Sequence, residues 1–396
     1  MREKLMTMLE ARKEEMIAIR RHLHAHPELS YHEEKTAAYI ADFYQRKAVD
    51  VQTDVGGNAV IVTINDASSG DTLALRADFD ALPIEEETGL PFASTSPGVM
   101  HACGHDAHTA YLMVLADCLI ELKAEIPGTI KVIHQHGEEA PPGGAKFIME
   151  TEALADVDHI IGIHVFPDRP AGEVAYRSGA AMAGGTQFKL VIQGVGGHGS
   201  SPHKANDAIV AGAYFVTTLQ TILSRRVNPF EAGAITVGSF DGKGSFNVIN
   251  DAVTLEGDMR YMTTDLFEVL SKELHQLVNG LEELFGVQTT LTLFEGCPPV
   301  YNDPELTSSV VDYLTTGIGD YLTDVVESPM LTGNEDFAYY TQKIPGCFFY
   351  IGCRPKGIVN NVVYDNHHPK FDIDEEAISV AAKAVGEVVC GYFGIE

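Results

Sequence analysis

Short β-rich runs alternate with helical stretches in the first part of the chain, and this alternation constrains the fold more than any other feature. The predicted elements are strands at 60–64, 72–77 and 129–133, and helices up to about Ala25, at about 33–46 and at about 106–122. Strands that alternate with helices imply an α/β sheet. Ile160–His164 is another predicted strand, with His164 at its C-terminal end, the edge at which such sheets assemble their sites.

A second pattern begins after the flexible joint Ala183-Gly184-Gly185 and ends where Gly296–Pro299 returns the chain. Its predicted elements are 186–193, 205–224, 234–240, 252–260, 266–283 and 288–294. At 396 residues the chain is long enough for two domains. We therefore predict a catalytic metal-binding domain formed by 1–183 and 296–396, and a smaller inserted domain at 184–295.

The composition disfavours some classes of binding partner for this protein. Asp and Glu outnumber Lys and Arg by 56 to 27, and the resulting charge of −29 repels nucleic acid and anionic lipid. No run is apolar for long enough to span a bilayer, and the charged N-terminus does not resemble a signal peptide. We expect a cytoplasmic protein whose six scattered cysteines remain free thiols.

Cys103 and His105 offer a thiolate and an imidazole two residues apart, and the adjacent acids Glu138-Glu139 follow downstream. No ordinary core needs this combination of donor types, so the pattern predicts a metal site. Five donors drawn from separate loops exceed what one structural zinc requires: Cys103, His105, Glu139, His164 and His367. Two ions that share a bridging ligand are the economical explanation, and such a pair acidifies a water and polarises a carbonyl oxygen.

Glu138 is then a free carboxylate, because its neighbour Glu139 is the ligand and the two side chains point in different directions. It can take the proton of the water and pass it to a leaving amine. Spacing alone leaves open whether His367 or the adjoining His368 is the ligand. A thiol hydrolase with Cys103 as nucleophile and His105 as base is an alternative, which the surplus of donors disfavours.

These residues also lie in motifs that resemble the binuclear metallo-amidohydrolases of the aminoacylase and carboxypeptidase G superfamily. This group includes hippurate hydrolases, indoleacetyl-amino-acid hydrolases and N-acyl-amino-acid deacetylases. The matching segments, in order, are Leu75–Pro83, Met100–His105, Glu138-Glu139, Gly162–His164, Gly196–Gly199 with Pro202-His203, Asn247–Ile249, Gly333–Phe337 and His367–Pro369. The resemblance covers nearly the whole chain.

The resemblance implies a fold and a role for each matching residue. The fold is a metallopeptidase-like catalytic domain, with a mixed sheet flanked by helices, and an inserted α+β lid that dimerises. Cys103 resembles the bridging ligand, and Asp80 resembles the acid that accepts the ring N–H of a ligand histidine. His198 would stabilise the oxyanion, in the site of the partner subunit, while Arg260 and Asn247 would clamp a free carboxylate.

We therefore expect a homodimer or tetramer that hydrolyses an N-acyl amino acid to a carboxylic acid and a free amino acid. Each chain is expected to use two divalent ions, zinc or manganese first, with cobalt or nickel as alternatives. The chain departs from the family at Gln135-His136-Gly137, where Gln-Pro-Ala is usual, and at Asn250, where proline is usual. A dipeptidase or carboxypeptidase of the same superfamily is the alternative enzyme, and a non-catalytic metal-binding protein is disfavoured by the presence of Glu138.

Overall fold

The computed structural model describes residues 1–65, 70–357 and 362–396, and these residues form two compact units. The first unit comprises Met1–Ala181, Val300–Met330 and Asp336–Glu396, and the second comprises Met182–Pro299 and Leu331–Glu335. The chain therefore leaves the first unit after Ala181 and returns to it at Val300. β7 (Gly179–Met182) and β14 (Val300–Asn302) pair with each other around these two crossing points.

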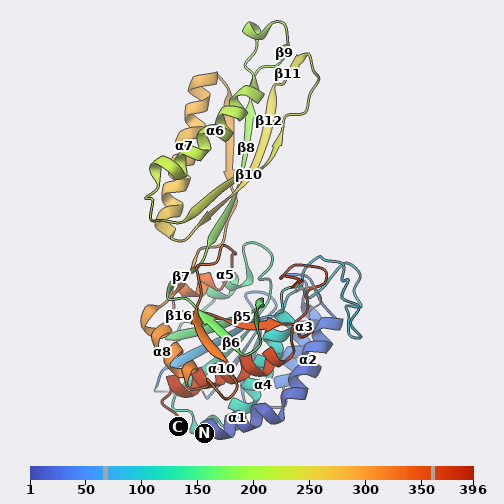
Figure 1. Cartoon of the computed structure of the whole chain (residues 1–396), viewed down its shortest axis with the longest axis vertical. Helices are drawn as coiled ribbons and strands as arrows, with labels where there is room; N and C mark the ends of the chain where they lie inside the picture. The colour runs from blue at the N-terminus through green and yellow to red at the C-terminus, as the bar shows by residue number, and fades with distance from the viewer. Residues whose placement is uncertain (66–69, 358–361) are drawn as a thin grey trace. The chain divides into compact units, whose positions relative to one another are not determined.

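An eight-stranded mixed sheet lies at the centre of the first unit (Figure 1). In spatial order its strands are β1 (Asp50–Val55), β2 (Ala59–Ile64), β4 (Thr129–Gln135), β3 (Thr72–Asp78), β5 (His159–Pro170), β16 (Gly346–Arg354), β6 (Glu173–Tyr176) and β15 (Asp324–Glu327). The central strands β4, β3, β5 and β16 are parallel, whereas β1, β2 and β4 pair antiparallel. The segments that follow β3 and β4 consequently leave the sheet at the same edge.

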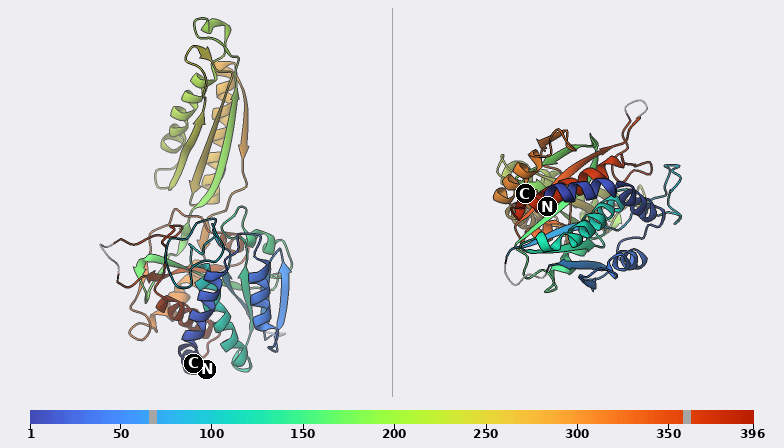
Figure 2. Two further views of the ribbon diagram at one scale, coloured as in Figure 1. Left: turned by 90° about the vertical axis from the view of Figure 1, so that its right-hand side faces the viewer. Right: turned by 90° about the horizontal axis from the view of Figure 1, so that it is seen from below.

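Helices cover this sheet, as Figures 1 and 2 show. They are α1 (Arg2–Ala11), α2 (Lys13–Ala25), α3 (Glu34–Tyr44), α4 (His105–Glu121), α5 (Gly144–Met149), α8 (Pro304–Thr315), α9 (Ala338–Thr341) and α10 (Glu376–Tyr392). α4 is buried from His105 to Ile120 because it packs between the sheet, α2 and α10. Such a helix is apolar on nearly all sides. His105 is its first residue, so the position of His105 is fixed by the packing of α4.

The second unit is a four-stranded antiparallel sheet with two helices packed on one of its faces (Figure 1). Its sheet strands, in spatial order, are β10 (Gly233–Asp241), β12 (Ala252–Tyr261), β8 (Gly184–Gln193) and β13 (Gln288–Leu293), and its helices are α6 (Ala208–Arg226) and α7 (Thr264–Phe285). Exposure alternates along β13, which is typical of a sheet with one face buried. A small two-stranded antiparallel sheet, β9 (Gly197–His198) with β11 (Val248–Ile249), belongs to the same unit.

The predicted fold class is confirmed, with a mixed sheet flanked by helices and a smaller α+β unit. Two local predictions were wrong. The first helix is interrupted at Arg12, whose guanidinium donates to Glu15 and to Asp117 of α4. β5 does not end at His164, because pairing with β16 continues as far as Pro170 and places the histidine inside the strand.

Candidate metal centre

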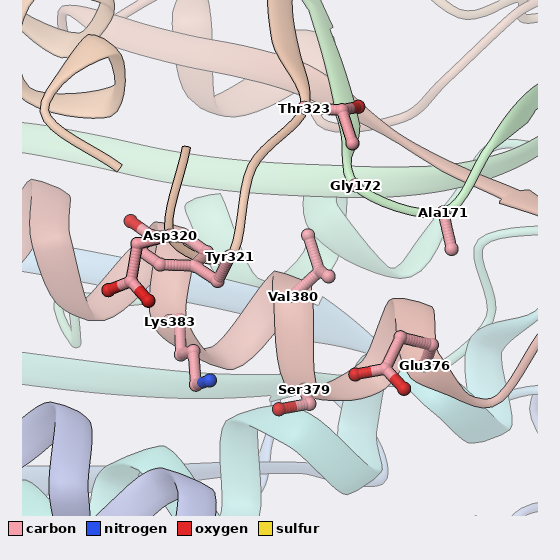
Figure 3. Close-up of a pocket in the computed structure, with 9 residues that line it drawn as sticks. All are labelled: Ala171, Gly172, Asp320, Tyr321, Thr323, Glu376, Ser379, Val380 and Lys383. Atoms are coloured by element: carbon pink, nitrogen blue, oxygen red, sulfur yellow. The ribbon is translucent and has the colours of Figure 1, made fainter. Parts of the chain in front are cut away.

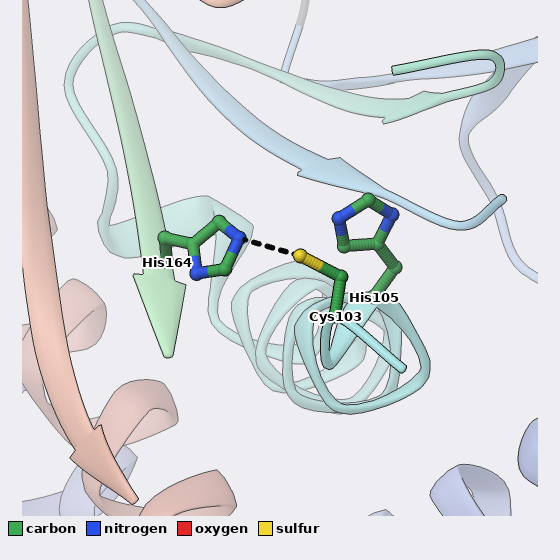
Figure 4. Close-up of side chains that lie close together, drawn as sticks. All are labelled: Cys103, His105 and His164. Atoms are coloured by element: carbon green, nitrogen blue, oxygen red, sulfur yellow. Dashed lines mark hydrogen bonds between the residues drawn. The ribbon is translucent and has the colours of Figure 1, made fainter. Parts of the chain in front are cut away.

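The structure brings the predicted donor residues of the first unit together beside the parallel strands. The donor atoms of Cys103, His105 and His164 all lie within 4.8 Å of one another (Figure 4). Among the predicted site residues, two further sets meet the same criterion: Cys103 with Glu139 and His367, and His105 with Glu138 and Glu139. We call the five predicted ligands the donor cluster: Cys103, His105, Glu139, His164 and His367.

A left-handed glycine sets the angle between the first two donors. Gly104 has φ +94°, and a Cβ built there would meet Val165 Cγ2 at 2.4 Å. Only glycine therefore fits between Cys103 and His105. α4 begins at His105, so this histidine is fixed to a buried helix while Cys103 stays in the loop before it.

Each buried histidine of the donor cluster is oriented through its Nδ1 atom. His164 Nδ1 donates to the carbonyl oxygen of Val165 at 2.8 Å, and its Nε2 then faces Cys103 Sγ at 3.3 Å. His105 Nδ1 donates to the Asp80 carboxylate at 3.1 Å, which leaves Nε2 facing the cluster. A donated Nδ1 proton fixes the tautomer in which Nε2 carries a lone pair for a metal ion.

Asp80 connects His105 to the acid pair. Its carboxylate accepts the ring proton of His105, the backbone N–H of Glu139 at 2.9 Å and the hydroxyl of Ser30 at 2.7 Å. Burial alone would raise the pKa of Asp80, but the hydrogen bond from His105 and these other donors lower the pKa below its usual value. Asp80 therefore remains an anion that can hold both His105 and Glu139 in place.

The donor cluster fits a divalent cation. His105 Nε2 and Glu139 Oε1 are buried, lie 3.9 Å apart and have no hydrogen-bond partner within the described part of the chain. Burial and the nearby carboxylate of Glu139 raise the pKa of the Cys103 thiol well above its usual value. Buried polar atoms without partners are costly, and a bound cation would satisfy them and stabilise the thiolate.

The structure distinguishes the two C-terminal histidines. His367 Nε2 lies 3.2 Å from Glu139 Oε1, and the His367 backbone N–H donates to Ala102 O at 2.7 Å. His367 adopts φ +67°, an uncommon conformation for a residue other than glycine. His368 instead accepts the backbone N–H of Lys370 at its Nδ1 and stacks on Tyr364. His367 is therefore the histidine that reaches the donor cluster.

Glu138 lies beside the donor cluster and is held by the C-terminal part of the chain. Its Oε1 accepts the backbone N–H of Asp336 at 3.4 Å. The Asp336 carboxylate is itself buried and accepts from Arg76, from Gln135 and from the backbone N–H of Ala145. Glu138, the candidate base, is thus hydrogen-bonded to Asp336, whose own position is fixed by several hydrogen bonds.

His108 and Asp78 hold the backbone next to His164 in place, and the sequence did not predict this role. His108 Nδ1 donates to Asp78 Oδ1 at 2.6 Å, and His108 Nε2 accepts the backbone N–H of Val165, the residue after His164, at 3.0 Å. Both ring nitrogens of His108 are therefore occupied, which favours a supporting role over metal ligation. The only local signal was the position of His108 one helical turn after His105.

The other predicted site residues belong to the second unit. His198 lies on β9, and its Nδ1 accepts the backbone N–H of Ser200 at 3.1 Å, so the neutral ring carries its proton on Nε2. Asn247 precedes β11 and is exposed. Arg260 Nε donates to Asp258 Oδ2 at 2.6 Å, and Arg260 Nη1 also donates to Asn334. The second unit thus offers an N–H donor, an amide and a guanidinium.

A separate hollow of about 210 Å³ lies beside α10 (Figure 3). Its lining residues are Ala171, Gly172, Asp320, Tyr321, Thr323, Glu376, Ser379, Val380 and Lys383. No member of the donor cluster lines it. Within the described residues, no helix combines the length and the apolar character needed to cross a bilayer.

Comparison with known proteins identifies related sequences over nearly the whole length. Residues 74–390 match the model of peptidase family M20/M25/M40. The chain is 43% identical to Bacillus subtilis YhaA, a protein described by its similarity as an amidohydrolase, over 96% of this chain and 95% of that protein. It is 37% identical to the N-acetyl-L-cysteine deacetylase of the same organism, over 93% and 86% of the two chains.

Two solved structures share the fold. An aminohydrolase from methicillin-resistant Staphylococcus aureus has a TM-score of 0.94 and 51% identity, covering 99% of this chain and all of that one. Bacillus subtilis YxeP, described as a dinuclear metal-binding peptidase of the M20 family, has a TM-score of 0.83 and 31% identity, covering 98% of this chain and all of that one. The chain therefore belongs to peptidase family M20/M25/M40, which confirms the family predicted from its motifs.

Proposed function

We propose that this protein is a metal-dependent amidohydrolase that cleaves N-acyl amino acids to a carboxylic acid and a free amino acid. The observation that carries the proposal is the buried donor cluster beside the carboxylate of Glu138, in which His105 Nε2 and Glu139 Oε1 make no hydrogen bond within the described residues and face other donors of the cluster. The similarity to an N-acetyl-L-cysteine deacetylase supports the same reaction class. The chemistry consumes one water and breaks one linear amide C–N bond.

The donor cluster would hold two divalent ions, with Cys103 as the shared ligand and His105, Glu139, His164 and His367 as the others. When bound, such ions acidify a water molecule and polarise the amide carbonyl. The similarity to a dinuclear M20 peptidase supports a count of two. The mixture of thiolate, imidazole and carboxylate donors suits zinc, and manganese is the other ion that we propose.

Glu138 would act as the general base and then as the general acid. It takes the proton of the attacking water and delivers it to the nitrogen of the leaving amine, so the carboxylate is regenerated at the end of the cycle. The Asp336 N–H at 3.4 Å keeps Oε1 of this side chain in place without neutralising it. Asp80 keeps His105 oriented during the same steps.

The second unit would supply the contacts to substrate. We propose that His198 Nε2–H donates to the oxyanion that forms at the carbonyl carbon, in the site of the partner subunit. Arg260 and Asn247 would bind the free carboxylate of the amino acid. Arg260 already touches Asp258 and Asn334, and a substrate carboxylate would replace one of these partners.

We also propose that the second unit acts as a lid and joins two chains. Several large apolar side chains of this unit are exposed, and those on or beside α6 form a candidate contact surface: Ile209, Val210, Tyr214 and Phe240. Exposed apolar side chains that lie together in a patch mark protein contacts more often than single exposed apolar side chains do. A homodimer would cover them, and a tetramer could form through further surfaces.

A substrate screen tests the proposed reaction. Metal-free protein is reconstituted separately with zinc, manganese, cobalt and nickel, and each form receives N-acetyl, N-benzoyl and N-indoleacetyl amino acids. Free dipeptides form the matched arm, because they offer the same amide bond next to an α-amino group. Faster release of amino acid from the N-acyl compounds supports the proposal, whereas a preference for dipeptides favours a peptidase, and no hydrolysis in any arm contradicts both.

A further inference from the structure

The turn between α2 and α3 holds a strained residue. Tyr31 has φ +67°, and β-carbon crowding makes this conformation unfavourable for any residue except glycine. Its backbone N–H donates to Glu33 Oε1 at 2.9 Å. Strain of this kind persists only where surrounding contacts enforce it, and such places cluster at functional sites.

Glu33 is fully buried, and it contacts the backbone immediately before the acid pair. Its Oε1 also accepts the N–H of Gly137 at 2.9 Å, and its Oε2 accepts from Asn58 Nδ2 at 2.9 Å. These partners are neutral amides, and burial raises the pKa of Glu33 to about 7. The side chain therefore serves as a hydrogen-bond acceptor for two backbone N–H groups and not as half of an ion pair.

Tyr31 contacts the backbone on the other side of the acid pair. Its hydroxyl donates to Ala140 O at 2.7 Å and accepts the N–H of Gly143 at 3.1 Å. The ring also packs on Gly137, where an added Cβ would lie 2.7 Å from Tyr31 Cε1. Residues 137–143, which we call the acid-pair loop, are thus held at both ends from one turn of the N-terminal segment.

Ser30 adds a third contact from the same turn. Its hydroxyl donates to Asp80, the carboxylate that also accepts the N–H of Glu139. Three residues of one turn therefore act on the acid-pair loop: Glu33 before the two glutamates, Ser30 at Glu139 through Asp80, and Tyr31 after them. Adjacent side chains that must point in different directions need a fixed backbone between them, since small displacements at a reacting centre are costly.

We propose that Tyr31 and Glu33 are positioning residues that hold the acid-pair loop, so that Glu139 meets the metal ions and Glu138 meets the substrate. The inference rests on the proposed function, because it takes Glu138 as the base and Glu139 as a ligand. Neither Tyr31 nor Glu33 is required to touch the substrate.

Tyr31→Phe is the first test, because it removes one hydroxyl and keeps the ring. We expect the affinity of the weaker zinc site to fall about tenfold, measured by competition with a chromogenic chelator, since groups that orient ligands affect affinity by roughly 10–100-fold. At saturating zinc, we expect kcat to fall about tenfold with KM nearly unchanged.

Tyr44→Phe is the matched control. Tyr44 is a buried tyrosine of the same unit, whereas Tyr31 is half-buried, and the Tyr44 hydroxyl contacts His134 at 2.9 Å and no residue of the acid-pair loop among the hydrogen bonds of the described residues. This variant should lose thermal stability but keep zinc affinity and kcat within twofold of wild type. If zinc affinity and kcat of Tyr31→Phe also stay within twofold, the inference is overturned. A loss in either quantity supports it and shows which glutamate the turn holds.

Glu33→Gln and Glu33→Leu form the second test. Gln keeps an oxygen for the N–H groups of Tyr31 and Gly137, and the amide of Asn58 can rotate to match its NH2 group. Leu keeps the volume and removes the acceptor. We expect the Gln variant to stay within threefold of wild type in kcat and zinc affinity, and the Leu variant to lose tenfold or more. Equal behaviour of the two variants, both near wild type, contradicts the inference.

These outcomes can be separated from a failure of the proposed function. A wild-type protein that hydrolyses no N-acyl amino acid contradicts the proposed reaction, while the zinc titrations still decide whether the turn positions Glu139. An active wild-type protein beside unimpaired Tyr31→Phe and Glu33→Leu proteins contradicts the inference alone.

Discussion

The donor cluster of the first unit and the proposed substrate contacts of the second unit are held in opposite ways. In the donor cluster, His105 and His164 are buried, and each has its Nδ1 proton committed to a fixed oxygen. In the second unit, His198 and Asn247 are exposed on or beside the two-stranded sheet of β9 and β11, and the His198 ring is contacted by Ser200, two residues later.

This difference indicates which side chains are already held in place before substrate binds. A buried network keeps the geometry of metal binding and proton transfer independent of the substrate, which is the condition for effective electrostatic stabilisation. Exposed groups lose conformational freedom only when the substrate, or a partner subunit if the proposed dimer forms, binds against them, and this ordering lowers the affinity. Loss of a group from the donor cluster should therefore affect turnover, whereas loss of a carboxylate contact in the second unit should affect binding, and only an oxyanion donor of that unit should also affect turnover.

Removal of the metal ions should have the largest effect. A chelator is expected to abolish hydrolysis, and elemental analysis of reconstituted protein should approach two divalent ions per chain, because five donors exceed the needs of one ion. A fully active protein with a single tightly bound ion, and no response to added metal, would contradict the binuclear centre.

Substitution of the base comes next. Glu138→Gln should retain both ions and lose roughly 10²–10⁴-fold in kcat, because the amide fills the same volume but cannot accept a proton from water. Kinetics at saturating substrate and metal analysis on the same sample check this expectation. Near-normal turnover with the metal in place would show that another group is the base.

His198→Ala tests the contribution of the second unit to turnover. Loss of one oxyanion donor costs roughly 10²–10³-fold in kcat. If His198 acts in the site of the partner subunit, mixing this variant with Glu138→Gln and reassembling the dimers should restore activity, since a heterodimer contains one site with both groups. Demonstrated subunit exchange without recovery would place the donor in its own chain or make His198 purely structural.

Arg260→Gln should show the smallest effect, on binding alone. We expect KM to rise roughly 10–100-fold with little change in kcat, as hydrogen bonds to charged groups contribute about 1.5–3 kcal/mol. Arg226→Gln is the matched control, because Arg226 is an exposed arginine of the same unit, paired with Glu273. An N-acetyl amino acid amide, which lacks the carboxylate, should not distinguish Arg260→Gln from wild type; a clear difference would point to a structural role.

The sequence predicted the α/β fold class through the periodicity of its elements, and it predicted the family and the reaction class through motifs that resemble those of known metallo-amidohydrolases. Spacing alone could not decide between His367 and His368, since the choice depends on a left-handed backbone at His367 and on a hydrogen bond to Ala102. The end of β5 was missed for a similar reason, because its extension depends on pairing with β16. Contacts between distant segments leave no local pattern.

The role of the turn at Tyr31 and Glu33 was also hidden from the sequence. Locally these residues look like ordinary turn and helix-start residues. Their partners Gly137, Ala140 and Gly143 lie more than 100 residues later in the chain. Only the folded chain shows that a turn near the N-terminus reaches both ends of the acid-pair loop.

The extension of β5 beyond His164 bears on the order in which the ions exchange with solvent. His164 lies inside a strand paired with β16, so freeing it requires opening of the central sheet, whereas His367 lies in an exposed loop. Local opening is cheapest where few buried hydrogen bonds break. If two ions bind as proposed, an ion held by His367 and Glu139 would leave first and be replaced fastest, and the centre would then pass through a state with one ion held by the donors around His164.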